Sequence, residues 1–360
     1  MKNTIQTVFA ATGSYIPDMI VKNSDFLNHS FFEKNGTPIL KDNATVIEKF
    51  REIAGIEERR YARPEQRASD LGFLAAKDAL ESSGIDAETL DYIIVAHNFG
   101  DVTYETNRSD MVPTLASRIK HMLGIKNADC VAYDLPFGCP GWVQGVIQAD
   151  YFIRSGDAKR CMVIGTETLS RVVDPHDRDT MLYSDGGGAV ILEASSEETV
   201  GILSHKTQTH SLEHAMLLTM HNPVYDCGGE ENDIFLTMNG RKLYEFALSN
   251  VPLVVKAALD KAGVHLSEIK KVLIHQANDK MDNAILQRLF KLYDIESFDS
   301  AEVMPMIISW LGNSSVATVP TLLDIILKNK MPGHHIGKGD KVVFASVGAG
   351  MNINAIVYQF

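Results

Sequence analysis

The chain repeats a helix–strand unit at an interval of almost half its 360 residues. Residues 79–85 (ALESSGI) resemble residues 258–264 (ALDKAGV), and in each segment a glycine is placed to end a helix. A short polar link then leads to an apolar run, at residues 90–95 and 269–274, that is typical of a buried strand. One such match arises easily by chance, so a second match is needed before a duplication is inferred.

The second match lies at the ends of the two halves. Residues 181–192 and 342–358 each suggest a β segment, a glycine-rich turn and another β segment, in the same order as the first match. Alternating helices and apolar strands imply mixed or parallel sheets with helices packed on their faces. We therefore predict an α/β protein built from two related halves, residues 1–195 and 196–360.

Several helices can be delimited from the sequence. Ser69 is expected to cap a helix over residues 70–81, which carries one apolar face. Longer apolar patterns predict helices over residues 143–153 and 241–262. Residues 29–50 and 99–113 interrupt the repeat, and we expect these insertions to shape a substrate entrance or a subunit contact.

Composition excludes several classes of function. A formal net charge of −12 argues against a general nucleic-acid-binding protein, and an acidic partner would need a local basic patch. The chain has no apolar run of the roughly 18 residues that span a bilayer, and its first residues do not resemble a signal peptide. The four cysteines (130, 139, 161 and 227) show neither a CxxC pair nor metal-ligand spacing. We expect a cytoplasmic protein with free thiols, no metal and no membrane insertion.

Cys139 is placed for reactivity. It lies between the apolar run at residues 130–135 and the helix expected from residue 143. Free backbone N–H groups and the dipole at a helix start stabilise a thiolate. Taken alone, the cysteine fits a small residue of the core better than a nucleophile.

Two polar residues in the second half are candidate partners of this thiol. His275 follows the strand expected at residues 269–274, where parallel sheets place their sites, although a structural histidine is an alternative. Asn313 follows a glycine at an expected helix start, and helix capping is its alternative role. Cysteine, histidine and asparagine together suit acyl-thioester chemistry, because the thiolate accepts an acyl group while two neutral donors stabilise an enolate.

The motifs resemble those of β-ketoacyl-acyl-carrier-protein synthase III and its relatives in the thiolase superfamily. The resemblance covers nearly the whole chain, from residues 11–17 (ATGSYIP) and 55–60 (GIEERR) to residues 275–278 (HQAN) and 312–315 (GNSS). It implies the thiolase fold, a duplicated five-layer α-β-α-β-α architecture, and a homodimer. The implied substrates are acyl thioesters of coenzyme A or acyl carrier protein, with no permanently bound cofactor.

The resemblance also assigns roles. Cys139 is implied as the acyl-accepting nucleophile, and His275 with Asn313 as the decarboxylation pair. The backbone N–H groups of Cys139 and Ala349 are implied as the oxyanion hole, which tolerates alanine at position 349 if its φ is negative. Lys280 falls where the family commonly places an arginine near the phosphate of coenzyme A or the carrier.

Several positions depart from the family pattern. Lys49 and Ile53 stand where the housekeeping synthases carry a tryptophan that stacks on adenine and an arginine near the phosphates. Pro140 and Trp142 also differ from the usual residues beside the cysteine. These changes indicate a specialised relative and make a carrier-bound donor a credible alternative to coenzyme A.

The leading hypothesis is a decarboxylating Claisen condensation in fatty acid or specialised lipid or polyketide biosynthesis. An acyl group loaded on Cys139 is attacked by a malonyl- or β-ketoacyl-type thioester. One alternative is acyl transfer to an alcohol or amine without elongation, and another is an inactive partner of an active homologue. Retention of His275 and Asn313 favours condensation, and the intact Cys139 argues against an inactive partner.

Overall fold

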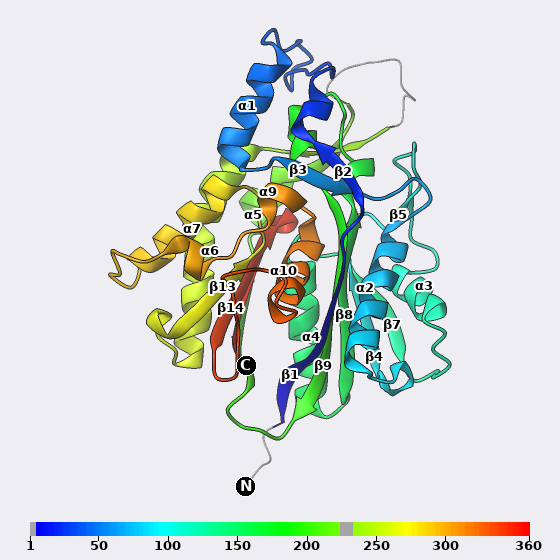
Figure 1. Cartoon of the computed structure of the whole chain (residues 1–360), viewed down its shortest axis with the longest axis vertical. Coiled ribbons are helices and arrows are strands. Elements are labelled where there is room, and N and C mark those ends of the chain that lie inside the picture. Colours follow the sequence, from blue (N-terminus) through cyan, green and yellow to red (C-terminus); the bar gives the residue numbers. More distant parts are fainter. Residues whose placement is uncertain (1–4, 224–232) are drawn as a thin grey trace.

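The computed structural model describes residues 5–223 and 233–360, which form two main sheets, three two-stranded sheets and the helices around them (Figure 1). The first sheet has the strand order β1-β9-β8-β4-β7. Within it, β4 runs parallel to β7 and β8, whereas β9 is antiparallel to both β8 and β1. Its strands are β1 (Gln6–Tyr15), β4 (Tyr92–Ala96), β7 (Val131–Leu135), β8 (Arg160–Thr168) and β9 (Asp185–Ser195).

The second sheet repeats this pattern with four described strands in the order β10-β15-β14-β13. Here β13 runs parallel to β14, and β15 is antiparallel to β14 and β10. The predicted duplication is confirmed, because β13, β14, β15 and β10 correspond in order and direction to β4, β8, β9 and β1. The strands are β10 (Gly201–Thr209), β13 (Ile269–Ile274), β14 (Lys341–Gly348) and β15 (Asn352–Gln359).

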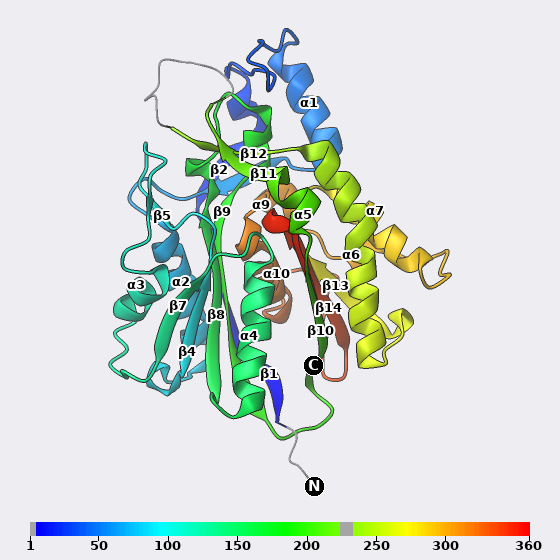
Figure 2. The same ribbon diagram turned by 180° about the vertical axis from the view of Figure 1, so that it is seen from behind.

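Helices complete five layers, as expected for the thiolase fold. The helices α4 and α10 lie between the two sheets, α2 and α3 cover the outer face of the first, and α6 and α7 cover the outer face of the second (Figures 1 and 2). A continuous apolar core joins the central helices to both sheets. The helices are α2 (Ala68–Ser83), α3 (Leu115–Met122), α4 (Gly141–Ser155), α6 (Gly240–Ala262), α7 (Asp279–Lys291) and α10 (Thr318–Leu327).

The helix ends of the repeat agree with the sequence. Gly84 and Gly263 end α2 and α6 in the left-handed conformation, with φ of 71° and 66°. The helices expected over residues 143–153 and 241–262 are α4 and α6. The division at residue 195 stays a prediction; β9 ends at Ser195 and β10 begins at Gly201.

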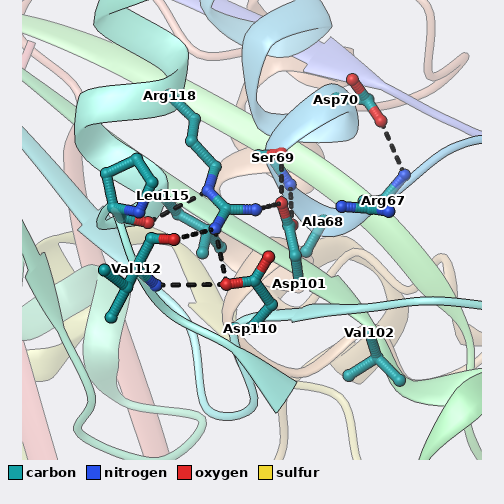
Figure 3. A network of polar contacts seen from close by, with 12 residues as sticks. Arg67, Ala68, Ser69, Asp70, Asp101, Val102, Asp110, Val112, Leu115 and Arg118 are labelled. Carbon is teal, nitrogen blue, oxygen red and sulfur yellow. Dashed lines mark hydrogen bonds and ion pairs between the residues drawn. The ribbon is translucent and has the colours of Figure 1, made fainter. Parts of the chain in front are cut away.

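The predicted cap of α2 is wrong. The helix begins at Ala68 after Arg67, so Ser69 lies inside its first turn. The backbone N–H and hydroxyl of Ser69 both donate to the carboxylate of Asp101, at 2.8 and 2.6 Å (Figure 3). The hydroxyl that was predicted to cap the helix thus bonds a carboxylate 32 residues away in the chain.

The prediction of a strand, a turn and a second strand at residues 181–192 is also wrong in its first part. Met181 and Leu182 belong to the 3₁₀ helix η4 (Arg178–Leu182), and the glycine run 186–188 lies within β9. The strand that corresponds to β14 is therefore β8. The second half does have the expected arrangement, with η8 (Ala349–Met351) between β14 and β15.

The two insertions lie toward one end of the molecule, together with several small elements (Figures 1 and 2). Residues 29–50 include the first part of the helix α1, and residues 99–113 contain the short strands β5 and β6. In the described residues, no helix combines the length and apolar character needed to cross a bilayer. The elements outside the main layers are β2 (Met19–Lys22), η1 (Asn23–Phe26), α1 (Asn43–Ala54), β3 (Glu58–Tyr61), η2 (Ala87–Thr89), β5 (Asp101–Val102), β6 (Ser109–Asp110), η3 (Leu169–Arg171), α5 (Ser211–His214), η5 (Ala215–Leu217), β11 (Leu218–His221), β12 (Phe235–Met238), η6 (Leu266–Glu268), α8 (Ser300–Val303), α9 (Ile308–Leu311) and η7 (Ser315–Ala317).

Candidate active site

A cavity of about 1130 Å³ lies where the two halves meet the insertion at residues 29–50. Cys139, His275, Asn313 and Ala349 all line it. Residues that are 210 positions apart in the chain therefore share one enclosed space, which is the arrangement that the sequence motifs predicted.

Cys139 is fixed by a close approach of two backbone segments. It precedes α4, whose N-cap is Pro140. A side-chain carbon on Gly348 would lie 2.6 Å from the Cys139 nitrogen, and one on Gly138 would lie 2.8 Å from the Ala349 nitrogen. Glycine is required at both positions by this contact. The backbone segments that carry the nitrogens of Cys139 and Ala349 consequently lie close together, and Ala349 has a negative φ.

The position of Cys139 at a helix start agrees with expectation, but the thiolate is not the resting form. Burial raises the pKa of the Cys139 thiol to about 11. A hydrogen bond with the Ser315 side chain and one with its own backbone N–H act in the opposite direction. The sequence shows that the thiol lies at a helix start, which favours the thiolate. It does not show that the thiol is enclosed by other parts of the chain, and this burial disfavours the charged form. With this pKa the thiol is protonated at neutral pH.

His275 is held directly after β13. Its backbone N–H donates to the Ala345 carbonyl at 2.9 Å, which extends the pairing of β13 with β14. Burial lowers the pKa of the ring to about 4, although a hydrogen bond with the backbone of Ser315 acts the other way. The imidazole is therefore neutral at physiological pH and presents one donor and one acceptor.

Gln276, the next residue, fixes the segment that leads to Asn313. Its Nε2 donates to the Pro305 carbonyl at 3.0 Å, and its Oε1 accepts from the N–H groups of Ile307 and Ile308 at 2.8 and 3.0 Å. This side chain is fully buried. The motif HQAN thus contributes a structural clamp besides its histidine.

Asn313 is oriented by its neighbours. Its backbone N–H donates to the Leu182 carbonyl and its carbonyl accepts from the Ser184 N–H, both at 2.9 Å. Its side-chain Oδ1 accepts from the Ser315 N–H at 2.9 Å. Because the oxygen of the amide is used in this way, Nδ2 is the end that can donate to a ligand in the cavity.

Three further polar residues near the thiol were not predicted as site residues. Asn98 Nδ2 donates to Ser315 Oγ at 3.1 Å, and the Asn98 N–H donates to Glu167 Oε1 at 2.6 Å. Burial raises the pKa of Glu167 to about 8. Asn98 lies two residues beyond the end of β4, and His275 directly follows β13, so both lie near corresponding strand ends of the repeat.

The walls of the cavity are largely apolar. One side is formed by residues around η3, β11 and β12, and another by residues on and before α1. The apolar lining residues include Leu169, Tyr183, Met220 and Leu236 on the first side, and Ile39, Val46 and Phe50 on the second. This surface fits a hydrocarbon chain beside the polar groups at Cys139.

Basic residues also line the cavity. Lys49 and Ile53 lie on α1 and line the cavity, as do Lys41 and Arg241, which the sequence analysis did not single out. Lys280 is exposed on the first turn of α7, and its neighbour Met281 lines the cavity. Trp142 is buried in the core, where it stacks on Phe9.

Of the three described cysteines, Cys139 is the one that lines the cavity. Cys130 and Cys161 are buried, and burial raises the pKa of each thiol. Cys227 lies outside the described residues.

Known proteins resemble this chain in sequence and in structure. Residues 133–211 match the family model described as 3-oxoacyl-[acyl-carrier-protein] synthase III, and residues 259–360 match the model of its C-terminal part. A β-ketoacyl-[acyl-carrier-protein] synthase III of Vibrio vulnificus is 33% identical over 350 residues, which are 97% of this chain and 98% of the relative.

Two further proteins extend this resemblance. A synthase III of Pectobacterium atrosepticum is 32% identical over 98% of this chain and 99% of its own length. The crystal structure of the enzyme of the same name from Thermus thermophilus superposes with a TM-score of 0.80 and 28% identity, covering 98% of each chain.

Proposed function

The chain belongs to the 3-oxoacyl-[acyl-carrier-protein] synthase III family, and on this premise we propose that it joins two acyl thioesters by decarboxylating Claisen condensation. The observation that carries the proposal is the convergence of Cys139, His275 and Asn313 on one cavity. Each of the three side chains has a distinct chemical task in this reaction.

In the first step, Cys139 Sγ attacks the carbonyl carbon of an acyl thioester. The C–S bond to the donor breaks, the donor leaves as a thiol, and the proton of Cys139 goes to that thiol. The backbone N–H groups of Cys139 and Ala349 stabilise the negative oxygen of the tetrahedral intermediate. Their proximity, imposed by Gly138 and Gly348, supports this role.

In the second step, a malonyl-type thioester loses carbon dioxide and becomes an enolate. His275, neutral because of its burial, and Asn313, through Nδ2, donate hydrogen bonds to the enolate oxygen. The enolate carbon attacks the acyl group, the bond to Cys139 Sγ breaks, and a β-ketoacyl thioester leaves. The donor end of Asn313 favours this reaction over transfer to an alcohol or amine, which needs no enolate stabilisation.

We propose a donor with a hydrocarbon chain, carried as a phosphopantetheine thioester. The cavity exceeds the roughly 300–1,000 Å³ of ordinary small-ligand sites, and its apolar walls support an acyl chain. Lys41, Lys49 and Arg241 support contact with an acidic carrier protein or a phosphate, and Lys280 is the further candidate. Lys49 offers no aromatic ring to stack on adenine, and Ile53 offers no guanidinium for the phosphates, which favours the carrier over coenzyme A. We place the reaction in the cytoplasm, consistent with the free thiols of the described cysteines.

We also propose a homodimer, formed at the edge of the first sheet. In the described sheet β7 is an edge strand, and unpaired edges invite pairing with another chain. Beside it, Arg118 bonds the carboxylates of Asp101 and Asp110 and the carbonyl of Val112 (Figure 3). This clasp holds Val112 outward with 86% of its surface exposed. Light scattering of the purified protein should give twice the chain mass, and a monomer would contradict the dimer.

The condensation is tested by incubating the protein with acyl thioesters and then with a malonyl thioester. Intact-protein mass spectrometry should show one acyl group on Cys139, which disappears when the second substrate is added. The product should be a β-ketoacyl thioester, formed with release of carbon dioxide. An ester or amide without carbon dioxide release, or no acyl-enzyme at all, would contradict the proposal.

A further inference from the structure

A series of hydrogen bonds leads from a buried carboxyl group to the proposed nucleophile. Glu167 on β8 accepts from the Asn98 N–H at 2.6 Å and also hydrogen-bonds the side-chain amide of Asn98. Asn98 Nδ2 donates to Ser315 Oγ at 3.1 Å. Ser315 and Cys139 both line the cavity, and the Ser315 side chain lowers the pKa of the Cys139 thiol. The steps of the proposed condensation use neither Asn98 nor the Ser315 hydroxyl.

The chemistry of these groups fixes the direction of the bonds. The NH₂ end of an asparagine amide can only donate, so Ser315 Oγ must accept from Asn98. A serine hydroxyl has a single hydrogen, which Asn98 leaves free for Cys139 Sγ. A thiolate sulfur has no hydrogen and can only accept, so in that form the hydroxyl is the donor, and a donor in this position favours the thiolate over the thiol.

Ser315 is held in this position. Its N–H donates to Asn313 Oδ1 at 2.9 Å, and its side chain is buried. Its φ is 51°, a left-handed conformation that is uncommon for a residue with a side chain. Such conformations persist where surrounding contacts impose them, and they concentrate at functional sites.

The ionisable groups that face the thiol carry no charge at neutral pH. Burial keeps the pKa of Glu167 at about 8 and that of His275 at about 4, and it raises the pKa of Tyr183. Glu167 would raise the pKa of Cys139 if it were ionised. A neutral Glu167 can anchor Asn98 without opposing formation of the thiolate.

We propose that Asn98 and Ser315 are positioning residues which direct a hydroxyl hydrogen at Cys139 Sγ and thereby stabilise the thiolate that attacks the acyl thioester. The inference rests on the proposed function for the role of Cys139 as nucleophile. Its test reads the reactivity of the thiol alone, so it can fail or succeed independently of condensation.

The test measures the rate at which methyl methanethiosulfonate modifies Cys139 between pH 6 and pH 10, read by peptide mass spectrometry. Ser315→Ala removes the donor, and we expect the thiol pKa to rise by about one pH unit. The thiolate fraction then falls about tenfold, and the greater nucleophilicity of the more basic thiolate returns part of this loss. The net result is a rate about threefold lower at every pH below the pKa.

Asn98→Asp reverses the direction of the bonds, because an ionised carboxylate only accepts and draws the Ser315 hydrogen away from sulfur. We expect it to slow the modification at least as much as Ser315→Ala. Asn278→Asp is the matched control: Asn278 also lines the cavity, and its side chain caps α7 as an acceptor, a role that aspartate keeps. It adds the same charge without touching the hydrogen-bond series.

The double variant Asn98→Asp/Ser315→Ala separates the effect of reversing the hydrogen bonds from the effect of the added charge. In the Ser315→Ala background, Asn98→Asp should have no more effect than Asn278→Asp has. Thermal unfolding verifies that each variant is folded. If Ser315→Ala does not fold, the proposal is tested with Asn98→Asp. Unchanged modification rates in a folded Ser315→Ala or Asn98→Asp variant, or an equal effect of Asn98→Asp with and without Ser315, would overturn the proposal.

Discussion

The two halves of the molecule share a framework but place different chemistry near corresponding strand ends and helix starts. Two residues beyond the end of β4 the first half carries Asn98, and directly after β13 the second half carries His275. At the start of its central helix the first half has Cys139, and the second has Ser315 just before α10. Cys139 and His275 line one cavity, and Asn98 bonds Ser315 across the halves.

This comparison explains why the duplicated fold has one active site rather than two. A duplication supplies two strand ends and two helix starts that meet at the centre of the molecule. A thiol occupies one helix start and a hydroxyl the other, so in the proposed reaction the first half provides the nucleophile and the second provides His275 and Asn313. The contrast is strongest at Cys139, and the predictions below begin there.

Cys139→Ala removes the nucleophile of the first half, and it should lower the rate of condensation by at least about a thousandfold. The physical reason is that no other residue at the equivalent positions can hold an acyl group as a thioester. Mass spectrometry should show no acyl-enzyme. Cys130→Ala is the control, since Cys130 is buried away from the cavity lining and acylation should persist. Acylation of Cys139→Ala at the normal rate would break the assignment.

Asn313→Asp tests the contribution of the second half. The change keeps the oxygen that accepts from Ser315 but replaces the donating Nδ2 by a charge that repels an enolate. Condensation should fall by about 10²- to 10³-fold while acylation of Cys139 continues. Separate assays of acyl-enzyme formation and carbon dioxide release measure the two steps. Equal losses in both steps would show that Asn313 does not act on the decarboxylation alone.

The ends of β8 and β14 sharpen the comparison further, because the first half has Glu167 there and the second has Gly348. Gly348→Ala places a carbon 2.6 Å from the Cys139 nitrogen, which forces the two backbones apart. We expect acylation and condensation both to fall by about tenfold to a hundredfold, as the oxyanion donors separate.

The matched control for this change is Gly186→Ala. Gly186 lies in β9, and an added carbon there would meet its nearest neighbour at 3.5 Å, an ordinary contact. Its acylation rate should stay within about twofold of the parent protein. A Gly348→Ala protein that is folded and fully active would show that the proximity of Cys139 and Ala349 has no catalytic role.

The sequence predicted the framework well because the repeat records local structure twice. The glycine helix ends, the buried strands and the motifs at Cys139, His275 and Asn313 are all local patterns. It failed where a partner is distant in the chain: Ser69 bonds Asp101 and does not cap α2. The raised pKa of Cys139 has the same origin, because the enclosure that disfavours the thiolate is assembled from both halves and the insertion.

Asn98 and Glu167 were missed for a different reason. Neither lies in a recognisable motif, and each acts through a neighbour rather than on a substrate. Asn98 is identified only when the end of β4 is compared with the end of β13, which requires the strands to be placed. Glu167 is identified by its burial, which the sequence does not record.

Glu167 also gives the smallest predicted effect, a pH dependence of stability that originates in the first half. Burial raises the pKa of its carboxyl from 4.5 to about 8. Between these values the folded protein holds a proton that the unfolded chain releases, so this group makes the free energy of unfolding fall as pH rises from about 4.5 to about 8. Above pH 8 both states are ionised and the contribution is constant.

Glu167→Gln keeps the shape of the side chain but cannot ionise, so its stability relative to the parent protein should increase across that pH range. The gain should be on the order of a few kcal/mol between pH 5 and pH 8.5, measured by urea denaturation. Glu197→Gln, at an exposed position after β9, is the control and should show no comparable gain. A parallel pH dependence of Glu167→Gln and the parent protein would mean that Glu167 is already ionised when folded. The group that holds Asn98 would then be a charged carboxylate, and the proposed role of a neutral Glu167 at the end of β8 would be wrong.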